Sequence, residues 1–287
     1  MNTLRASSSL GSLLLLIAVP VFGNVFGPDR RVPVSLTGSD LEAIGMVVQL
    51  SKSNRELESC TGSLVGERLV LTAAHCVGSR AGVLDPDIRT VFFPAAGTEN
   101  QAQSHQSFRA IHLWTGPWRN ESDSRAGDWA ILLLDHSPAH GGREPFAYLS
   151  VTDENLQPGA SVVAVGYSSD RLGGQLPTAD FNCHIHTVLR DGAFQHDCAA
   201  FAGASGGPIL SFFRGHRGLK YRIVGVHNAH KSLGTSGLRL ADFRSDRANL
   251  GSEASNFSRL LNQLQIRYGA HPLAKSAPSV TIALNRG

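Results

Sequence analysis

The sequence predicts an all-β fold, and three observations support that prediction. Hydrophobic residues fall into short runs rich in Val, Ile and Leu, a pattern typical of strands. The 30 Gly and 13 Pro, together with Asp and Ser, interrupt these runs as turn residues do. No regular alternation of strands with amphipathic helices is present, which disfavours a doubly wound α/β fold. The expected strands are 44–50, 62–65, 68–71, 90–93, 129–134, 161–166, 183–189, 208–212 and 221–226.

A single helix is expected near the C-terminus. Ser252 or Ser255 is available to cap its start, and the residues from about 268 onward are expected to form a tail. The helix is predicted by apolar residues at positions i, i+3, i+4 and i+7, which share one helical face: Phe257, Leu260, Leu261 and Leu264.

Composition places the chain among ordered globular proteins. Its 287 residues suffice for one large domain or two smaller ones. Hydrophobic residues make up 42% and charged residues 17%, which excludes disordered and coiled-coil classes. The net charge of +3 comes from 26 basic and 23 acidic residues without a run of five like charges, so no nucleic-acid partner is expected.

The first 23 residues have the features of a secretory signal peptide. Residues 10–22 form an apolar stretch after a segment with one charge, Arg5, and the stretch ends near small residues typical of a signal peptidase site. We expect cleavage after Gly23 and a secreted or periplasmic protein that is not attached to a membrane. A membrane anchor is the alternative, but the stretch is shorter than the roughly 20 apolar residues that span a bilayer.

The composition changes at residues 136–150, which contain several Gly and Pro and would serve as a linker between two halves. A cleft between the halves would let distant residues form one site. The expected organisation is a signal peptide at 1–23, an N-terminal segment at 24–41, a first barrel at 42–135, the linker at 136–150, a second barrel with the helix at 151–266, and a tail at 267–287.

Four cysteines fit an exported chain, and an even count predicts two disulfides with three possible connectivities. We prefer the local pairs Cys60–Cys76 and Cys183–Cys198. Each closes a loop of about 16 residues, which stabilises the fold by roughly 3 kcal/mol in the chain-entropy model. Zinc binding is the alternative, because His75, His184 and His186 lie beside cysteines, but the CxxC spacing of structural zinc modules is absent.

Two distant segments contain the residues of a serine-nucleophile site. His75 lies in Thr72-Ala73-Ala74-His75-Cys76, and Ser205 lies in Gly203-Ala204-Ser205-Gly206-Gly207-Pro208. A serine hydroxyl attacks well at neutral pH only when a neighbouring base removes its proton, and histidine suits that task. Each motif alone has an ordinary explanation, because a single His is usually a surface or core residue and Ser-Gly-Gly is usually a turn.

Asp128 is the expected third member of this site, with Asp123 and Asp135 as competitors. An apolar run follows Asp128, which indicates entry into a buried strand. A buried carboxylate needs a partner, and His75 would provide one. Asp135 ends the same strand beside polar residues, where solvation is expected.

The motifs around His75, Asp128 and Ser205, in that order, resemble those of the trypsin/chymotrypsin-like serine endopeptidases across residues 42–266. The resemblance implies two six-stranded antiparallel β-barrels and hydrolysis of protein or peptide substrates by a monomer without a cofactor or metal. It implies that Ser205 is the nucleophile, His75 the general base and Asp128 the carboxylate that orients it. Gly203 and Ser205 would supply the backbone N–H groups of the oxyanion hole.

The sequence departs from the commonest family pattern in two places. Ala204 stands where digestive proteases carry an Asp that pairs with a new N-terminus, so that activation switch cannot form. Residues 26–34 instead resemble the N-terminal stretch of bacterial glutamyl-endopeptidase-like members. The dibasic pair Arg30-Arg31 is an alternative site for trimming.

The resemblance also places a substrate pocket beside Ser205, with Ala199, Ala200, His227, Asn228 and Ala229 as candidate binding residues. Ala199 occupies the position of the Asp that binds Lys or Arg in trypsin, so a preference for basic residues is not expected. A His at the place of His227 meets the substrate carboxylate in glutamyl endopeptidases. However, Ala200 lacks the usual hydroxyl, so acidic and small or apolar preferences both remain open.

Two other classes of function fit parts of the sequence. Residues 203–207 also match GxSxG, the motif of α/β-hydrolase esterases, which would require Asp242 or Asp246 and a later His such as His271. A protease-like protein that binds a partner without catalysis is the other alternative. An intact set of three catalytic residues favours the protease.

Overall fold

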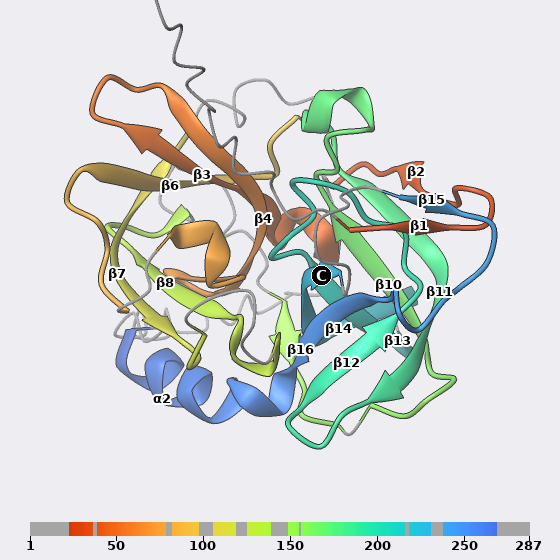
Figure 1. The fold of residues 1–287 in the computed structure, drawn as a ribbon. Helices are drawn as coiled ribbons and strands as arrows, with labels where there is room; N and C mark the ends of the chain where they lie inside the picture. The colour runs from red at the N-terminus through yellow and green to blue at the C-terminus, as the bar shows by residue number, and fades with distance from the viewer. Residues whose placement is uncertain are drawn as a thin grey trace, which may run out of the picture.

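The computed structural model describes residues 23–36, 39–78, 82–97, 106–118, 125–138, 149–154, 156–215, 218–230 and 238–268. Residues 1–22 of the expected signal peptide, the middle of the predicted linker, Asp123, and the predicted tail after Tyr268 lie outside this part of the chain. The described residues form two six-stranded antiparallel barrels, which lie side by side in Figure 1. The all-β, two-barrel prediction is confirmed.

The first barrel closes on itself in the order β3-β4-β5-β8-β7-β6, with β6 paired to β3. All five residues of β8 are buried, which explains its uninterrupted apolar sequence. Its strands are β3 (Ile44–Ser51), β4 (Glu56–Gly66), β5 (Leu69–Thr72), β6 (Ile88–Pro94), β7 (Phe108–Thr115) and β8 (Ala130–Leu134).

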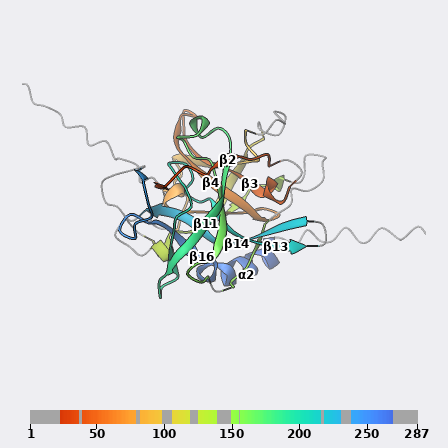
Figure 2. The ribbon, with the colours of Figure 1, turned by 90° about the vertical axis from the view of Figure 1, so that its right-hand side faces the viewer.

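The second barrel follows the order β10-β13-β14-β16-β12-β11, and a pairing of β10 with β11 closes it. Two short strands extend it, β2 (Val32–Pro33) along β11 and β9 (Ser150–Val151) along β14. Figure 2 shows β11, β14 and β16 from the side. The six barrel strands are β10 (Ser161–Gly166), β11 (Thr178–Val188), β12 (Ala193–His196), β13 (Pro208–Gly215), β14 (Gly218–His230) and β16 (Asn249–Glu253).

Three barrel strands, β7, β12 and β16, were not predicted from the sequence. β7 contains polar residues such as Arg109 and His112 among its apolar ones. β12 is only four residues long, and β16 reads Asn-Leu-Gly-Ser-Glu, yet both are fully buried between neighbouring strands. Their pairing in the barrel, rather than their own hydrophobic pattern, determines their structure.

The expected helix is α2 (Ser258–Tyr268), and it lies under the first barrel in Figure 1. Leu261 and Leu264 are buried, and Gln265 Nε2 donates a hydrogen bond to the carbonyl of Val65 in β4. The predicted caps are wrong. Ser252 lies in β16, and Ser255 lies in the 3-10 turn before the helix, where its hydroxyl contacts Glu253.

The two disulfides connect Cys60 with Cys76 and Cys183 with Cys198, as predicted, with Cα–Cα distances of 6.0 and 4.7 Å. No cysteine among the described residues is free, so none offers the thiolate that the zinc alternative requires. Cys60–Cys76 ties β4 to the segment that carries His75. Cys183–Cys198 ties β11 to the segment that precedes the serine turn.

Residues 24–34, which we call the N-terminal strap, pack on the second barrel. Asn24 is fully buried, and its side chain accepts from the N–H of Leu238 and donates to the carbonyl of Arg247. Its carbonyl accepts from the N–H of Ala200, and its own N–H donates to Asn249 Oδ1. The short strand β1 (Val25–Phe26) then runs parallel to β15 (Arg239–Leu240).

The dibasic pair of the strap is held by ion pairs. The Arg31 side chain is 1% exposed, and its guanidinium contacts both Asp29 and Asp170, at 2.8 and 2.6 Å. Arg30 reaches the buried carboxylate of Asp180 at 3.5 Å. A protease would therefore have to open this cluster to reach the peptide bond after Arg31.

Candidate active site

His75 and Asp128 meet because the strands of the first barrel beside them are paired. His75 follows β5 and Asp128 precedes β8, and Thr72 lies opposite Ala130 in the register of these strands. The Asp128 carboxylate is fully buried. Its Oδ2 lies 2.9 Å from His75 Nδ1, and its Oδ1 accepts the backbone N–H of His75 at 3.0 Å.

This contact fixes the protonation pattern of the imidazole. An ionised carboxylate can only accept hydrogen bonds, so Nδ1 of His75 carries a proton and Nε2 of the neutral ring is left as the acceptor. Burial by itself lowers the pKa of His75, but the charge and hydrogen bond of Asp128 outweigh it and raise that pKa above its usual value. Burial acts to raise the pKa of Asp128, but His75 and Arg125 reverse this and hold it below its usual value.

Ser205 lies in a tight turn between Gly203 and Gly206, both of which have positive φ, at 86° and 81°. The turn is fixed by backbone hydrogen bonds from Thr61 N to Ser205 O and from Gly206 N to His227 O. A Cβ on Gly206 would lie 2.1 Å from the Thr72 hydroxyl. The serine turn therefore packs directly against the segment that leads into His75.

In the described part of the chain, no hydrogen bond connects Ser205 Oγ with His75 Nε2, whose near contact is Cys76 Sγ at 3.7 Å. Catalytic hydrogen bonds are often long in a free enzyme and shorten when substrate binds. The Ser205 residue is 6% exposed, and the His75 side chain is 19% exposed. Ser205 is therefore nearly buried and His75 is partly exposed, and the contact between their segments is made through Gly206 and Thr72.

Two backbone N–H groups of the serine turn are available to bind an oxyanion. The N–H groups of Ala204, Gly206 and Gly207 each donate to a carbonyl, whereas those of Gly203 and Ser205 donate to no acceptor among the described residues. A Cβ on Gly203 would lie 2.3 Å from the Tyr167 carbonyl, so this position requires glycine.

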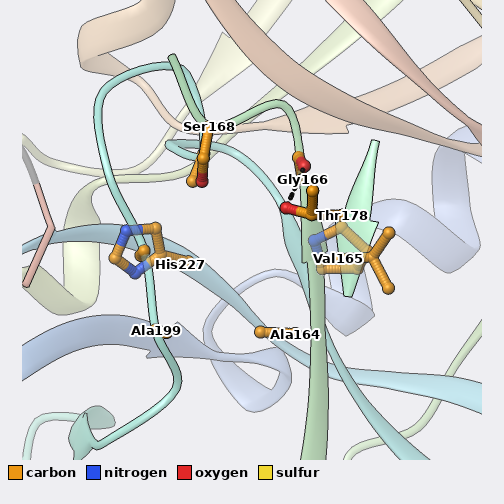
Figure 3. A pocket seen from close by; sticks show the side chains of 10 residues that line it. Ala164, Val165, Gly166, Ser168, Thr178, Ala199 and His227 are labelled. Atoms are coloured by element: carbon orange, nitrogen blue, oxygen red, sulfur yellow. Dashed lines mark hydrogen bonds between the residues drawn. The ribbon is translucent and has the colours of Figure 1, made fainter. Parts of the chain in front are cut away.

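A small pocket opens beside this turn (Figure 3). Its polar side chains are Ser168, Thr178 and His227, and the Thr178 hydroxyl donates a long hydrogen bond of 3.4 Å to the Gly166 carbonyl. None of the lining residues carries a carboxylate. The lining consists of Ala164, Val165, Gly166, Ser168, Thr178, Ala199, Ala200, Ala204, Pro208 and His227.

Of the predicted pocket residues, Ala199, Ala200 and His227 line this cavity, whereas Asn228 and Ala229 do not. Ala229 is buried in β14 opposite Leu250. Asn228 points to the first barrel instead, where its Nδ2 donates to the carbonyl of Arg125 at 2.7 Å.

Sequence reasoning missed a histidine behind the pocket. His196 in β12 is fully buried, and its Nε2 lies 3.2 Å from His227 Nδ1. Burial first, and the neighbouring His227 second, hold the pKa of His196 well below its usual value. β12 was not predicted as a strand, so no sequence signal placed His196 beside His227.

Trp118 was also missed. Its ring meets the His75 ring edge to face, with the ring centres 6.0 Å apart. It follows β7 and is the last residue of the described segment 106–118. No motif marks it, because its position depends on the path of the chain between β7 and β8.

The comparison with protein families gives a family for this arrangement: the Trypsin family model matches residues 38–238, more than half of the chain. The chain belongs to the trypsin family. In this trypsin-family protein the α/β-hydrolase alternative is wrong, because the Ser205 turn is part of a β-barrel protein.

Curated relatives of this trypsin-family chain include Serine protease 23 from Mus musculus, 26% identical over 236 residues, and from Homo sapiens, 25% identical over 232 residues. Each alignment covers 74% of this chain, which spans only 58% of the length of these relatives.

Solved structures of low identity share the fold. A Glu endopeptidase, determined in complex with MPD, aligns with a TM-score of 0.61 and 20% identity over 84% of this chain and 99% of its own. The protease Anisep from Arthrobacter nicotinovorans aligns with a TM-score of 0.53 and 18% identity over 80% and 97%. A search of the described residues for membrane-spanning helices found none that is long and apolar enough.

Proposed function

We propose that this protein is a serine endopeptidase in which Ser205, His75 and Asp128 form the catalytic triad. The observation that carries the proposal is the pair of hydrogen bonds that bind His75 to a fully buried Asp128, next to a glycine turn that presents Ser205. The N–H groups of Gly203 and Ser205 in this turn donate to no acceptor in the described part of the chain. Together these groups meet the needs of acyl transfer.

In the proposed reaction, Ser205 Oγ attacks the scissile carbonyl while its proton moves to His75 Nε2. The carbonyl oxygen becomes an oxyanion, which the N–H groups of Gly203 and Ser205 would bind. His75 then gives its proton to the leaving amine, and an acyl-enzyme remains. Water attacks that ester with His75 again as the base, which releases the acid and restores the Ser205 hydroxyl.

A fluorophosphonate probe tests this proposal, because it reacts with activated serines. We expect stoichiometric labelling of the folded protein and complete loss of labelling in Ser205→Ala. Labelling should be unchanged in Ser53→Ala, because Ser53 is an exposed serine distant from Ser205 in the sequence. The proposal fails if the folded protein is not labelled. That result would favour a protease-like binding protein.

We further propose cleavage after glutamate. The pocket contains two hydroxyl groups and an imidazole, from Ser168, Thr178 and His227, and it contains no acidic residue that would repel a substrate carboxylate. The fold of the protein is similar to that of a Glu endopeptidase. The absence of a carboxylate in the lining also removes the electrostatic basis for binding Lys or Arg.

Cleavage of a random peptide mixture tests the preference. We expect enrichment of Glu before the cleaved bond. In Ser168→Ala the preference for Glu should weaken, while peptides without Glu at that position should still be cleaved. Enrichment of Ala or Leu instead would show that the pocket selects small apolar side chains. Ser53→Ala again serves as the matched control.

We also propose that the protein is secreted and that its mature chain begins at Asn24. Both disulfides fit an oxidising compartment. Asn24 is fixed by buried hydrogen bonds, so the segment after the expected cleavage site has a defined place in the fold. N-terminal sequencing of the exported protein would test this, and a mature chain that starts after Arg31 would contradict it.

A further inference from the structure

A second positively charged side chain contacts the carboxylate of the site. Arg125 lies in the 3-10 turn η3 (Arg125–Gly127), three residues before Asp128. Its Nη1 lies 3.1 Å from Asp128 Oδ2, the oxygen that also contacts His75 Nδ1 at 2.9 Å. Arg125 is 10% exposed at its side chain and Asp128 is fully buried, so this is not a surface ion pair.

The second barrel holds this turn in place. Asn228 Nδ2 in β14 donates to the carbonyl of Arg125 at 2.7 Å and to that of Asp128 at 3.3 Å. The Ser252 hydroxyl in β16 donates to the carbonyl of Ala126 at 2.7 Å. These bonds reach the backbone rather than the carboxylate. Among the described residues, the side chains that contact the Asp128 carboxylate are those of His75 and Arg125.

The charges that act on His75 come from three elements. Asp128 precedes β8, Arg125 lies in η3, and Glu58 lies on β4, on the strand that carries Cys60. Burial lowers the pKa of His75, Asp128 and Glu58 raise it, and the positive charge of Arg125 opposes that rise. Arg125 thus favours the neutral imidazole, the form that can accept the serine proton.

We propose that Arg125 is a positioning residue that holds the Asp128 carboxylate against His75 and so supports His75 as the general base. It acts through Asp128 and does not touch the substrate. This inference rests on the proposed catalytic role of His75, Asp128 and Ser205.

The pH dependence of kcat/KM on a peptide substrate tests the proposal. Removal of the charge in Arg125→Gln is expected to move the acid limb upward by about 0.5–1 pH unit, as expected for a unit charge near a partly buried group. The same variant should lose about tenfold in kcat with little change in KM, since the carboxylate loses a fixed contact. Arg244→Gln, which breaks an exposed pair with Asp246, is the matched control and should leave the profile unchanged.

Arg125→Lys separates charge from geometry. Lysine keeps the positive charge but lacks the planar guanidinium group. The acid limb of the kcat/KM profile should therefore stay close to that of the wild type while kcat falls. An unchanged limb in Arg125→Gln, or a limb raised equally in Arg125→Lys, overturns the proposal. If the glutamine variant does not fold, Arg125→Lys still tests the positioning role, because an unchanged kcat in that variant overturns it.

An NMR titration of the His75 ring in the Ser205→Ala background separates this inference from the proposed function, because it needs no turnover. Ser205→Ala with Arg125→Gln should titrate at a higher pH than Ser205→Ala alone. No difference overturns the role of Arg125 even if the protein is an active protease. If the His75 titration differs between the two variants but the protein with Ser205 intact hydrolyses no peptide, the electrostatic role of Arg125 stands and the proposed function is rejected.

Discussion

At the scale of single residues, the site depends on how the charges around His75 balance. Asp128 makes the imidazolium of His75 more stable than it is in water. This stabilises the transition state, but it also means that the imidazolium of the free enzyme loses its proton only at a higher pH. Since the pKa of His75 is raised above 6.5, we expect kcat/KM to rise with pH through a midpoint above 6.5. A steady-state profile on a peptide substrate measures this, and a midpoint below 6.5 would contradict it.

The same pair of residues makes stability depend on pH in a defined way. For His75 the folded pKa is raised, so its contribution is present below the unfolded pKa and is lost as pH rises through the folded one. For Asp128 the folded pKa is lowered, so its contribution is present above the unfolded pKa and is lost as pH falls through the folded one. The two contributions overlap between the usual pKa values of Asp and His.

At the scale of structural elements, the serine turn has a requirement that can be tested with a matched glycine. Gly203 and Gly159 both have a φ of 86°, but a Cβ on Gly203 would lie 2.3 Å from the Tyr167 carbonyl, whereas one on Gly159 meets nothing within 4 Å. Gly203→Ala should slow fluorophosphonate labelling by about 10²-fold, since it displaces an oxyanion donor. Gly159→Ala shares the backbone strain and should label at the wild-type rate. Equal rates in the two variants would contradict the assignment.

The N-terminal strap makes a separate prediction about stability. Arg31 is buried between Asp29 and Asp170, and its removal leaves these carboxylates only the more exposed Arg171 and Arg239 as partners. Arg31→Met should therefore lower the free energy of unfolding by about 3 kcal/mol. Urea unfolding followed by fluorescence would measure the change. Arg244→Met, which breaks an exposed pair, should have little effect. An equally small effect in both variants would mean that the strap is not part of the stable fold.

These elements show which parts of the molecule can be predicted from sequence. His75, Asp128 and Ser205 stand in local motifs, and the strands that carry the first two have continuous apolar runs, so pattern alone indicated them. Arg125 and His196 gain their importance from pairing across the barrels, through Asn228 and His227 respectively. Such contacts join residues about 31 to 103 positions apart, and no local pattern encodes them.

At the scale of the whole molecule, the hydrophobic core of the first barrel extends into the second, which also has a smaller cluster of its own around Phe194 and Ile209. Phe92 and Leu132 of the first barrel belong to the same buried cluster as Val163 and Leu210 of the second. Helix α2, which follows the second barrel, packs under the first. His75 and Ser205 therefore belong to two barrels that are joined by a continuous buried cluster.

This continuous cluster predicts that the barrels unfold together. We expect calorimetry of the disulfide-bonded protein to show a single transition with a van't Hoff enthalpy close to the calorimetric one. Tyr167→Phe should lower the midpoint of the whole transition, because the Tyr167 hydroxyl donates to the Ala96 carbonyl of the other half at 2.9 Å, and its loss costs about 1 kcal/mol. Tyr268→Phe at the partly exposed end of α2 is the control. Two transitions, or a shift confined to one of them, would mean that each barrel is stable alone and that the active site can open without unfolding either one.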